Sequence, residues 1–150
     1  MTFLPITDND DLGPQALAAS TLRDALVPYI GERATSLFSY AIADESGSLV
    51  NAVRLRRALV ENGEDPEHPQ VTEAEQLLID WGRLIARSPF DIPDEVYARV
   101  EKAFTPQLRG ILVAYAAQVI AAGLFLTVGR VALDENLYEF RKPGDERTVG

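Results

Sequence analysis

The chain has 150 residues, of which 47% are hydrophobic and 25% are charged, and this composition is typical of one globular domain. The net charge is -9, with 23 acidic against 14 basic residues, so the surface repels phosphate backbones and we expect no nucleic-acid partner. The sequence contains no cysteine, which excludes disulfides, thiolate nucleophiles and cysteine-based metal sites.

The amino-terminal third of the chain predicts an extended segment followed by two helices. Residues 1–12 form an acidic lead-in without the basic and long apolar regions of a secretory signal, so we expect a cytoplasmic protein. Pro14 suits the first turn of a helix over residues 15–27. Pro28 breaks or kinks that helix, and a second helix is expected over residues 31–43.

A third helix is predicted to begin near Ser46 or Ser48, either of which can cap a helix, and to end at Asn62 and Gly63. One face of this helix carries apolar residues at helical spacing, namely Leu49, Ala52, Val53, Leu59 and Val60. Arg56 projects from the middle of that face. Residues 63–70 follow as a surface loop that contains two prolines.

Two further helices are predicted between residues 72 and 104. Thr72 and Glu75 form a capping box, which opens a strongly amphipathic helix that ends at Ser88. Pro93 begins a shorter helix, because proline followed by acidic residues is typical of a first helical turn.

The last predicted helix is long and almost entirely apolar. Thr105 and Pro106 begin it, and it is expected to continue to about Leu133. Residues 110–129 contain no charged side chain, and Gln118 is their one strongly polar interruption. No segment shows the alternating pattern of a strand, so we expect the all-α fold class. About six helices should form one domain over residues 13–137, followed by a charged tail over residues 138–150.

Residues 110–129 could span a membrane, fill a core or lie in an interface between subunits. Twenty helical residues rise about 30 Å, which is enough to cross a bilayer. The many alanines, the central Gln118 and the amphipathic faces of the other helices favour a soluble core instead. Since five short helices do not cover every side of such a helix, we expect part of it to form an oligomer interface.

The order of these elements resembles a known helical family. The stretch TEAEQLLIDWGRLIARSPFDIPDEVYARVEKAFTPQLRGILVAYAAQVIAAGLFLTVGRVAL is similar to the second half of the carboxymuconolactone decarboxylase and alkylhydroperoxidase D-like superfamily. The preceding NAVRLRRALVENGED is similar to the family's motif helix, which also ends in glycine. The resemblance covers residues 20–137 and implies an alkylhydroperoxidase D-like bundle that assembles as trimers or hexamers.

The catalytic motif of the family's redox members is missing. That motif is E-x11-C-x-x-C-x-x-x-H, and counting back from Gly63 places Ser36, Ser48, Asn51 and Leu55 at its four positions. Peroxide reduction needs a thiolate nucleophile and a resolving thiol, so a thiol peroxidase is excluded. Lactone decarboxylation is less tightly excluded, because it needs proton transfer and anion recognition rather than sulfur.

Two functions remain open from the sequence. The first is a non-catalytic protein that binds a small molecule or assembles with copies of itself. The second is a cysteine-independent enzyme, a decarboxylase or lactone-type lyase, that acts on a small carboxylated substrate anchored by Arg56. We predict no membrane partner, because the composition of residues 110–129 favours a soluble core. We predict no cofactor, because no glycine-rich phosphate loop can be found. No Ser-His-Asp arrangement can be found either.

Arg56 is the main candidate ligand-binding residue, because a guanidinium on an apolar face needs a carboxylate, a carbonyl or a ligand as its partner. Its alternatives are an ion pair with a neighbouring acid or a side chain that reaches water. Ser48 and Asn51 are the other two candidates, as polar groups that could line a remnant pocket, while helix capping is the alternative for Ser48.

The other polar and aromatic residues favour structural roles. Gln118 suits an interhelical hydrogen bond, and the hydroxyls of Tyr40 and Tyr115 could reach a cavity, although tyrosines at this spacing usually pack in a core. His68 is expected in a solvated loop, and a single histidine without partners predicts no metal site.

Overall fold

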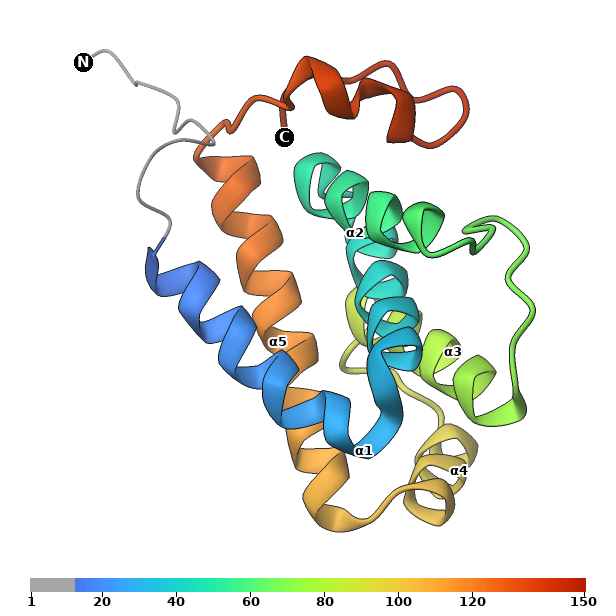
Figure 1. Cartoon of the computed structure of the whole chain (residues 1–150). Helices are drawn as coiled ribbons and strands as arrows, with labels where there is room; N and C mark the ends of the chain where they lie inside the picture. The colour runs from blue at the N-terminus through green and yellow to red at the C-terminus, as the bar shows by residue number, and fades with distance from the viewer. Residues whose placement is uncertain (1–12) are drawn as a thin grey trace.

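Helices form every regular element except one isolated bridge in residues 13–150, the part of the chain that the computed structural model describes, with side chains from residue 18 onward. The elements, labelled in Figure 1, are α1 (Gly13–Ser46), α2 (Leu49–Glu61), α3 (Glu73–Arg87), α4 (Asp94–Ala103), α5 (Pro106–Val128) and the 3-10 helix η1 (Glu135–Phe140). The predicted all-α class is confirmed. The predicted lead-in over residues 1–12 lies outside the described residues, and the finer assignment to an alkylhydroperoxidase D-like bundle stays a prediction.

The first helix bends sharply at Gly31, whose φ of 85° and ψ of 166° lie outside the helical region. Glycine tolerates this positive φ because it has no Cβ. The sequence predicts the break at Pro28, but the helix continues through this proline and breaks three residues later. Pro28 still weakens the helix at this point, because it lacks the backbone N–H that would bond to the preceding turn. We call residues 13–30 the first arm of α1 and residues 32–46 the second arm (Figure 1).

The second arm of α1, and not α5, occupies the centre of the fold. All ten residues from Ala34 to Ala43 are buried, and α1 contacts α2, α3 and α5. Alanine and serine are frequent here, and small side chains let neighbouring helices approach closely. The buried hydroxyls are satisfied within the helix, since Thr35 Oγ1 donates to the Gly31 carbonyl at 2.7 Å. The sequence predicts that residues 110–129 fill the core and leave part of the helix for an interface; α5 has one face in the core and one face exposed, but the second arm is the more completely buried helix.

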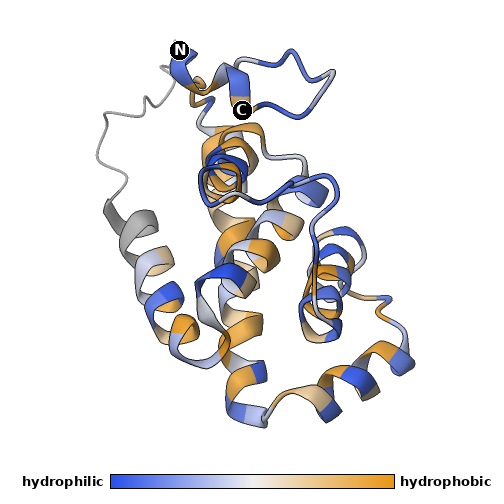
Figure 2. Cartoon of the chain, turned by 45° about the vertical axis from the view of Figure 1, so that its right-hand side comes forward, coloured by the Kyte–Doolittle hydropathy of each residue, from blue (hydrophilic) through white to orange (hydrophobic). Residues whose placement is uncertain are grey.

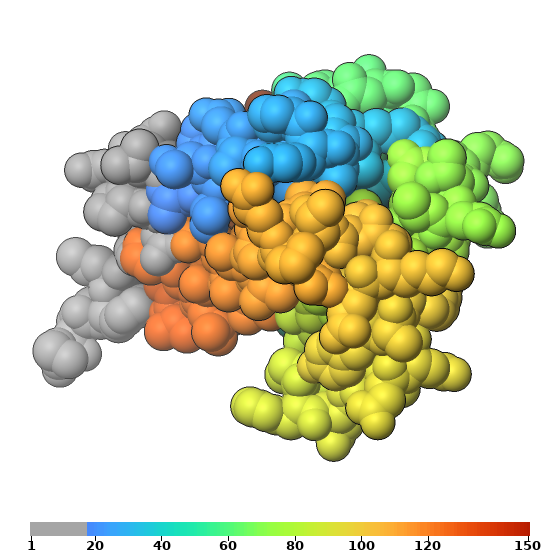
Figure 3. Space-filling model, turned by 90° about the horizontal axis from the view of Figure 1, so that it is seen from below, coloured from blue at the N-terminus to red at the C-terminus, as the bar shows by residue number. Residues whose placement is uncertain are grey.

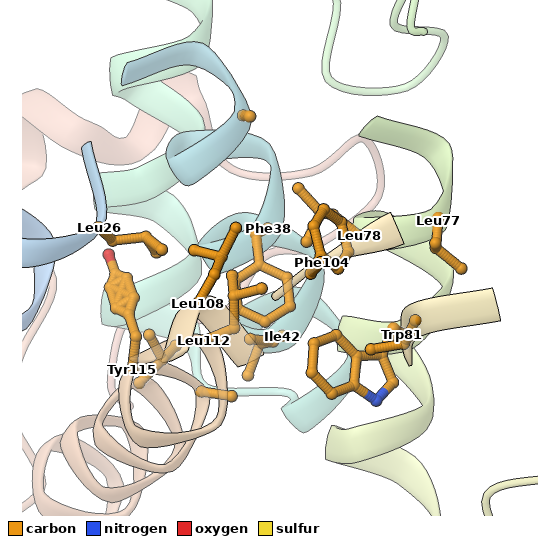
Figure 4. Close-up of a cluster of buried hydrophobic side chains, with 14 of the residues drawn as sticks. Leu26, Phe38, Ile42, Leu77, Leu78, Trp81, Phe104, Leu108, Leu112 and Tyr115 are labelled. Carbon is orange, nitrogen blue, oxygen red and sulfur yellow. The ribbon is translucent and has the colours of Figure 1, made fainter. Parts of the chain in front are cut away.

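The main hydrophobic core lies between the second arm, α3 and α5. Figure 4 shows Phe38 and Ile42 between Trp81 of α3 and Leu112 of α5. The rings of Phe38 and Trp81 lie 6.1 Å apart at an interplanar angle of 32°. Gly82 lets α3 approach the second arm, because a Cβ at this position would lie 3.1 Å from the Ile42 side chain. Seen from below, the first arm of α1 lies beside α5, and α4 extends away from them (Figure 3).

The start of α3 is fixed by the predicted capping box and by one arginine of α1. Thr72 Oγ1 accepts a hydrogen bond from the Glu75 N–H at 3.2 Å, and Glu75 Oε1 accepts one from the Thr72 N–H at 2.9 Å. Arg33 donates to Glu75 at 2.5 Å and to Glu64 at 2.7 Å, and it also donates to the Gln70 carbonyl. Arg33 therefore ties the bend in α1 to the α2–α3 loop.

The apolar helix is shorter than the sequence predicts. It was expected to reach Leu133, but α5 ends at Val128. Arg130 takes a left-handed φ of 55°, and the Val131 N–H then bonds back to the Leu126 carbonyl at 3.0 Å. These features form a Schellman motif, in which glycine usually holds the left-handed position. Gly129 directly follows the helix, but the left-handed position belongs to Arg130, a residue type that does not predict a helix end.

The residues after α5 fold back over α2 and the end of α5. The Leu133 N–H donates to the Thr148 carbonyl at 2.8 Å, and the Gly150 N–H donates to the Val131 carbonyl at 3.0 Å. A second hydrophobic cluster forms beneath this segment from Leu49, Val50, Val53, Leu126, Val131, Leu133 and Leu137. Residues 138–150, which the sequence separates as a charged tail, are thus attached to the helical domain.

Replacing Gly31 with alanine tests whether the bend depends on backbone conformation. Open space surrounds the position that a Cβ would take, so the cost comes from the positive φ alone. We expect Gly31→Ala to lower the free energy of unfolding by about 1–3 kcal/mol, measured by urea denaturation. Gly110 lies inside α5 with equally open space, so Gly110→Ala should raise stability by up to about 1 kcal/mol. A similar effect of both substitutions would contradict this account of the bend.

Acidification should weaken the contacts of Arg33. Its hydrogen bond holds the pKa of Glu64 below the ordinary value of 4.5. Burial raises the pKa of Glu75, but hydrogen bonds from Thr72 and Arg33 outweigh burial and leave this pKa lowered as well. Because both folded-state values are depressed, the stabilisation is complete above pH 4.5 and is lost as the pH falls through them.

We therefore expect the free energy of unfolding to fall between about pH 5 and about pH 3, and to fall less in Arg33→Gln than in the wild type. Urea denaturation at each pH measures this difference. Arg57→Gln is the control, because Arg57 pairs with the exposed Glu61 at 2.8 Å and lies 5.7 Å from the Phe140 ring, and it contacts neither Glu64 nor Glu75 in the interactions seen here. Equal pH dependence in the wild type and Arg33→Gln would show that Arg33 does not set these pKa values.

Candidate functional site

Arg56 lies on the inner face of α2 and is 8% exposed. Its Nη1 donates to the Tyr40 hydroxyl at 2.9 Å, and the same nitrogen forms an ion pair with Glu67 Oε1. The guanidinium carbon lies 6.0 Å from the centre of the Tyr40 ring. Three separate parts of the chain thus meet here, the second arm of α1, α2 and the α2–α3 loop.

The charges of this cluster stabilise one another. Burial alone lowers the pKa of Arg56, but the hydrogen bonds and charges of Tyr40 and Glu67 outweigh burial and raise it. Burial raises the pKa of Tyr40, and the nearby Asp44 adds to this effect, although the hydrogen bond from Arg56 opposes it. Tyr40 is therefore a neutral phenol at physiological pH, and Arg56 is a permanent cation.

A cleft of about 220 Å³ opens beside this cluster, between the second arm, α2, α3 and the α2–α3 loop. Its apolar lining consists of Leu37, Ala41, Leu59, Pro66, Pro69 and Ile79. Its polar lining consists of Tyr40, Glu67, Gln76 and Arg83. A smaller cavity of about 50 Å³ is lined by Tyr40 and Arg56. Tyr40 and Glu67 thus border the larger cleft, and Arg56 lies behind them and borders the smaller cavity.

A second group of charges closes the far end of this region. Arg83 of α3 reaches Asp44 at 3.1 Å and Glu45 at 3.4 Å, and Lys142 approaches Asp44 at 3.4 Å. These pairs connect α1 with α3 and with the residues after η1. Arg83 is thus already neutralised, although it lines the cleft. The sequence does not predict that Glu67 or this acidic pair belongs to a site. Acidic residues are common on protein surfaces, and only the fold brings these three beside buried or cleft-lining cations.

Ser48 and Asn51 face α5 and not the cleft beside Arg56. Asn51 Nδ2 donates to the Val119 carbonyl at 3.1 Å, and Ser48 Oγ donates to the Gly123 carbonyl at 3.5 Å. A Cβ at Gly123 would lie 3.0 Å from the Ser48 Cβ, so the two helices are in close contact here. Ser48 occupies the N-cap position of α2, but its side chain makes no capping hydrogen bond. Both residues join helices, and Arg56 stands apart from them.

The remaining sequence candidates have structural positions. Tyr115 is buried in the main core, and Gln118 is half buried on α5. The His68 side chain is 86% exposed, and its Nδ1 lies 3.7 Å from Asp65. Within residues 13–150, no three histidine, aspartate or glutamate side chains lie close enough to hold a metal ion.

A second candidate surface lies on the opposite side of the molecule. We call it the α5 face and define it by the exposed residues Gly110, Val113, Ala114, Ala117, Leu124 and Val128. The exposed fractions of its large side chains are 50% for Val113, 61% for Leu124 and 69% for Val128. Figure 2 shows hydrophobic residues following α5 along its length. Charged side chains are missing between residues 110 and 128, so the surface is uniformly apolar.

In the described part of the chain, α5 is the single helix that is long and apolar enough to cross a bilayer, judged by length and composition. Only 33% of its most apolar 18-residue stretch is buried within the chain. The helix therefore has one face in the core and one face open to another molecule.

Comparison of the chain with family models, with curated proteins and with solved structures gives no match. The resemblance to the carboxymuconolactone decarboxylase family rests on the sequence patterns quoted above and stays a prediction.

Substituting Arg56 tests whether the buried cluster stabilises the fold. In Arg56→Leu the Tyr40 hydroxyl and the Glu67 carboxylate lose a charged partner, so we expect unfolding to become easier by about 1–3 kcal/mol. The neighbouring Arg57 is half-buried, pairs with Glu61 and lies 5.7 Å from the Phe140 ring, so Arg57→Leu should cost about 1 kcal/mol or less. Urea denaturation gives both values. An Arg56→Leu protein as stable as Arg57→Leu would mean that Arg56 behaves as a surface residue.

Proposed function

We propose that this chain is a non-catalytic assembly protein that associates with copies of itself through the α5 face. In this proposal its scaffold is a divergent form of the carboxymuconolactone decarboxylase type that has lost redox chemistry. The observation that supports assembly is the exposure of Val113, Leu124 and Val128 on one uncharged helix face.

The α5 face is larger than a scattered set of apolar residues. From Gly110 to Val128 it is about 27 Å long and about 10 Å wide, which gives about 300 Å². An apolar patch of about 300 Å² is comparable to the largest patch on a typical soluble monomer, and such patches are often functional. A stable interface buries about 800 Å² on each partner, so residues of α1 and α4 beside α5 must supply the remaining area.

The distribution of side-chain sizes favours an antiparallel pair of α5 helices. The first half of the face carries three small residues, Gly110, Ala114 and Ala117, beside Val113, whereas the second half carries the larger Leu124 and Val128. A two-fold axis near the middle of the helix brings the large half of one copy against the small half of the other. Close packing follows, because large side chains fill the space that small residues leave.

Electrostatics also favours a contact at this surface. Each copy carries a net charge of -9, so two copies repel each other over most of their surfaces. The α5 face lies on residues 110–128, within the longest stretch of the sequence without a charged residue. Contact between two such faces therefore brings no like charges together. Salt screens the remaining repulsion, so association through this face should strengthen as ionic strength increases.

A bilayer is a less suitable partner for the same surface. The inner side of α5 packs against α1, α2, α3 and α4. The outer surfaces of these helices carry charged residues such as Glu32, Arg57 and Asp80. Because ionisable groups are costly in hydrocarbon, a membrane that surrounded α5 would also have to accommodate this charged layer.

A cysteine-independent enzyme remains the second candidate function, favoured by the position of Tyr40 and Glu67 in a cleft beside Arg56. Both groups could exchange protons with a substrate held there. In the structure, however, Glu67 is paired with Arg56, so it would first have to be released before it could act as a base.

Light scattering coupled to size-exclusion chromatography tests the assembly. At about 10 μM we expect the wild type to elute as an even-numbered oligomer, since pairing about a two-fold axis produces dimers or a hexamer of three pairs. Leu124→Glu should shift the protein to a smaller species, because it buries an unpaired charge in the interface. Circular dichroism should show unchanged helical content.

Val60→Glu is the matched control, because Val60 is 41% exposed on α2 and lies away from the α5 face. It should leave the oligomer unchanged. A monomeric wild type, or equal dissociation by both substitutions, would overturn the proposed assembly. Recovery of the wild type only in detergent would instead support a membrane role for α5.

A further inference from the structure

We propose that Arg56 and Tyr40 form a binding site for the carboxylate of a small apolar acid, and that Glu67 of the same chain fills this site until such a ligand displaces it. This inference does not depend on the assembly through the α5 face. It concerns the cleft on the other side of the molecule.

The receptor half of the site is rigid and buried. Arg56 is 8% exposed and Tyr40 is 5% exposed, and each projects from a helix in the body of the fold. The 2.9 Å hydrogen bond between them holds the guanidinium in one orientation. A guanidinium fixed in this way is suited to bind a carboxylate, because its N–H groups match the two carboxylate oxygens.

The carboxylate that occupies this receptor comes from a loop. Glu67 lies between α2 and α3, and its side chain is 31% exposed, in contrast to the buried arginine that it contacts. Its position therefore corresponds to that of a ligand at the mouth of a pocket. A buried arginine without any partner would be very costly, so the chain supplies its own acid.

The loop can release Glu67 without losing its attachment to the fold. Arg33 binds Glu64 before it at 2.7 Å and the Gln70 carbonyl after it. Only residues 65–69 lie between these two anchors, so release needs a local movement. The exchange replaces one carboxylate with another, and the charge on Arg56 remains paired throughout.

The cleft sets the size and polarity of the ligand. Its volume of about 220 Å³ equals that of about seven water molecules at about 30 Å³ each, which suits an acid with roughly ten non-hydrogen atoms. Leu37, Leu59 and Ile79 line the cleft together with Glu67, the residue that covers Arg56, so the body of a ligand that displaces Glu67 should be apolar. Arg83 is neutralised by Asp44 and Glu45, which leaves Arg56 as the cation for a single carboxylate. The chemical class is therefore a small monocarboxylate with an aromatic or branched aliphatic body.

Isothermal titration calorimetry with benzoate tests the site. Glu67→Gln removes the internal carboxylate and leaves Arg56 available, so we expect benzoate to bind this variant at least about tenfold more tightly than the wild type. Glu61→Gln makes the same change in net charge on the exposed side of α2, and its benzoate affinity should equal that of the wild type. Benzamide, which has the same shape without the charge, should not bind Glu67→Gln detectably.

Two further variants make the outcome decisive. Glu67→Asp keeps the charge but shortens the side chain, so it should also bind benzoate more tightly, and it tests the site even if Glu67→Gln does not fold. Adding Arg56→Gln to Glu67→Gln should abolish binding. The proposal is overturned if neither Glu67 variant binds benzoate more tightly than the wild type, if benzamide binds as well as benzoate, or if binding survives the loss of Arg56.

Discussion

The second arm of α1 is surrounded by α2, α3 and α5. A helix in that position can carry small side chains where its neighbours are close and large apolar side chains where it faces the core. Residues 34–43 meet this requirement with alanines, hydroxyl residues and a few large apolar side chains. Gly31 directs the arm into this position, because its positive φ turns the chain where an α-helix would have continued outward. Phe38 and Ile42 then fill the space toward α3 and α5. The positions of α2, α3 and α5 therefore depend on the size of the side chains that this arm presents to each of them.

Enclosure of this arm also produces the polar cluster. Tyr40 is carried into the interior with its helix, and a buried hydroxyl needs a hydrogen-bond partner, which Arg56 supplies. The arginine is itself buried, so it needs a carboxylate, and the loop residue Glu67 provides one. The burial of Tyr40 thus requires Arg56 as a partner, and the burial of Arg56 in turn requires Glu67. Tyr40 and Arg56 project from helices, whereas the last member, Glu67, comes from a loop.

In contrast to the second arm of α1, α5 is buried on one side only. Its inner side contributes Leu112, Ala116 and Val119 to the main core, while its outer side leaves Leu124 and Val128 in solvent. The helices of one chain cover a single side of it, since α1 and α3 are already packed against each other. Apolar surface left open in this way is lowered in free energy when a second molecule covers it. The cleft and the α5 face are therefore independent features, and ligand binding at one need not affect association at the other.

Elements that depend on local chemistry could be predicted from the sequence. Thr72 and Glu75 cap α3 as predicted, because a capping box is a contact between residues three apart. The all-helical class follows from apolar residues at helical spacing, and the need of Arg56 for a partner follows from its place among them. Each of these features involves residues that are close in the chain, which is why pattern and composition are sufficient to find them.

Three features depend on tertiary packing, namely which helix is central, where α5 ends and which acid meets Arg56. The composition of α5 suggested the central helix, but the second arm of α1 is buried at every position from residue 34 to residue 43, whereas α5 leaves one face exposed. The end at Val128 depends on a left-handed Arg130. Glu67 reaches Arg56 because the loop between α2 and α3 is held in place by Arg33, and Ser48 and Asn51 turn toward α5 instead. These contacts join residues far apart in the chain, and they depend on the packing of whole helices, which no local pattern in the sequence encodes.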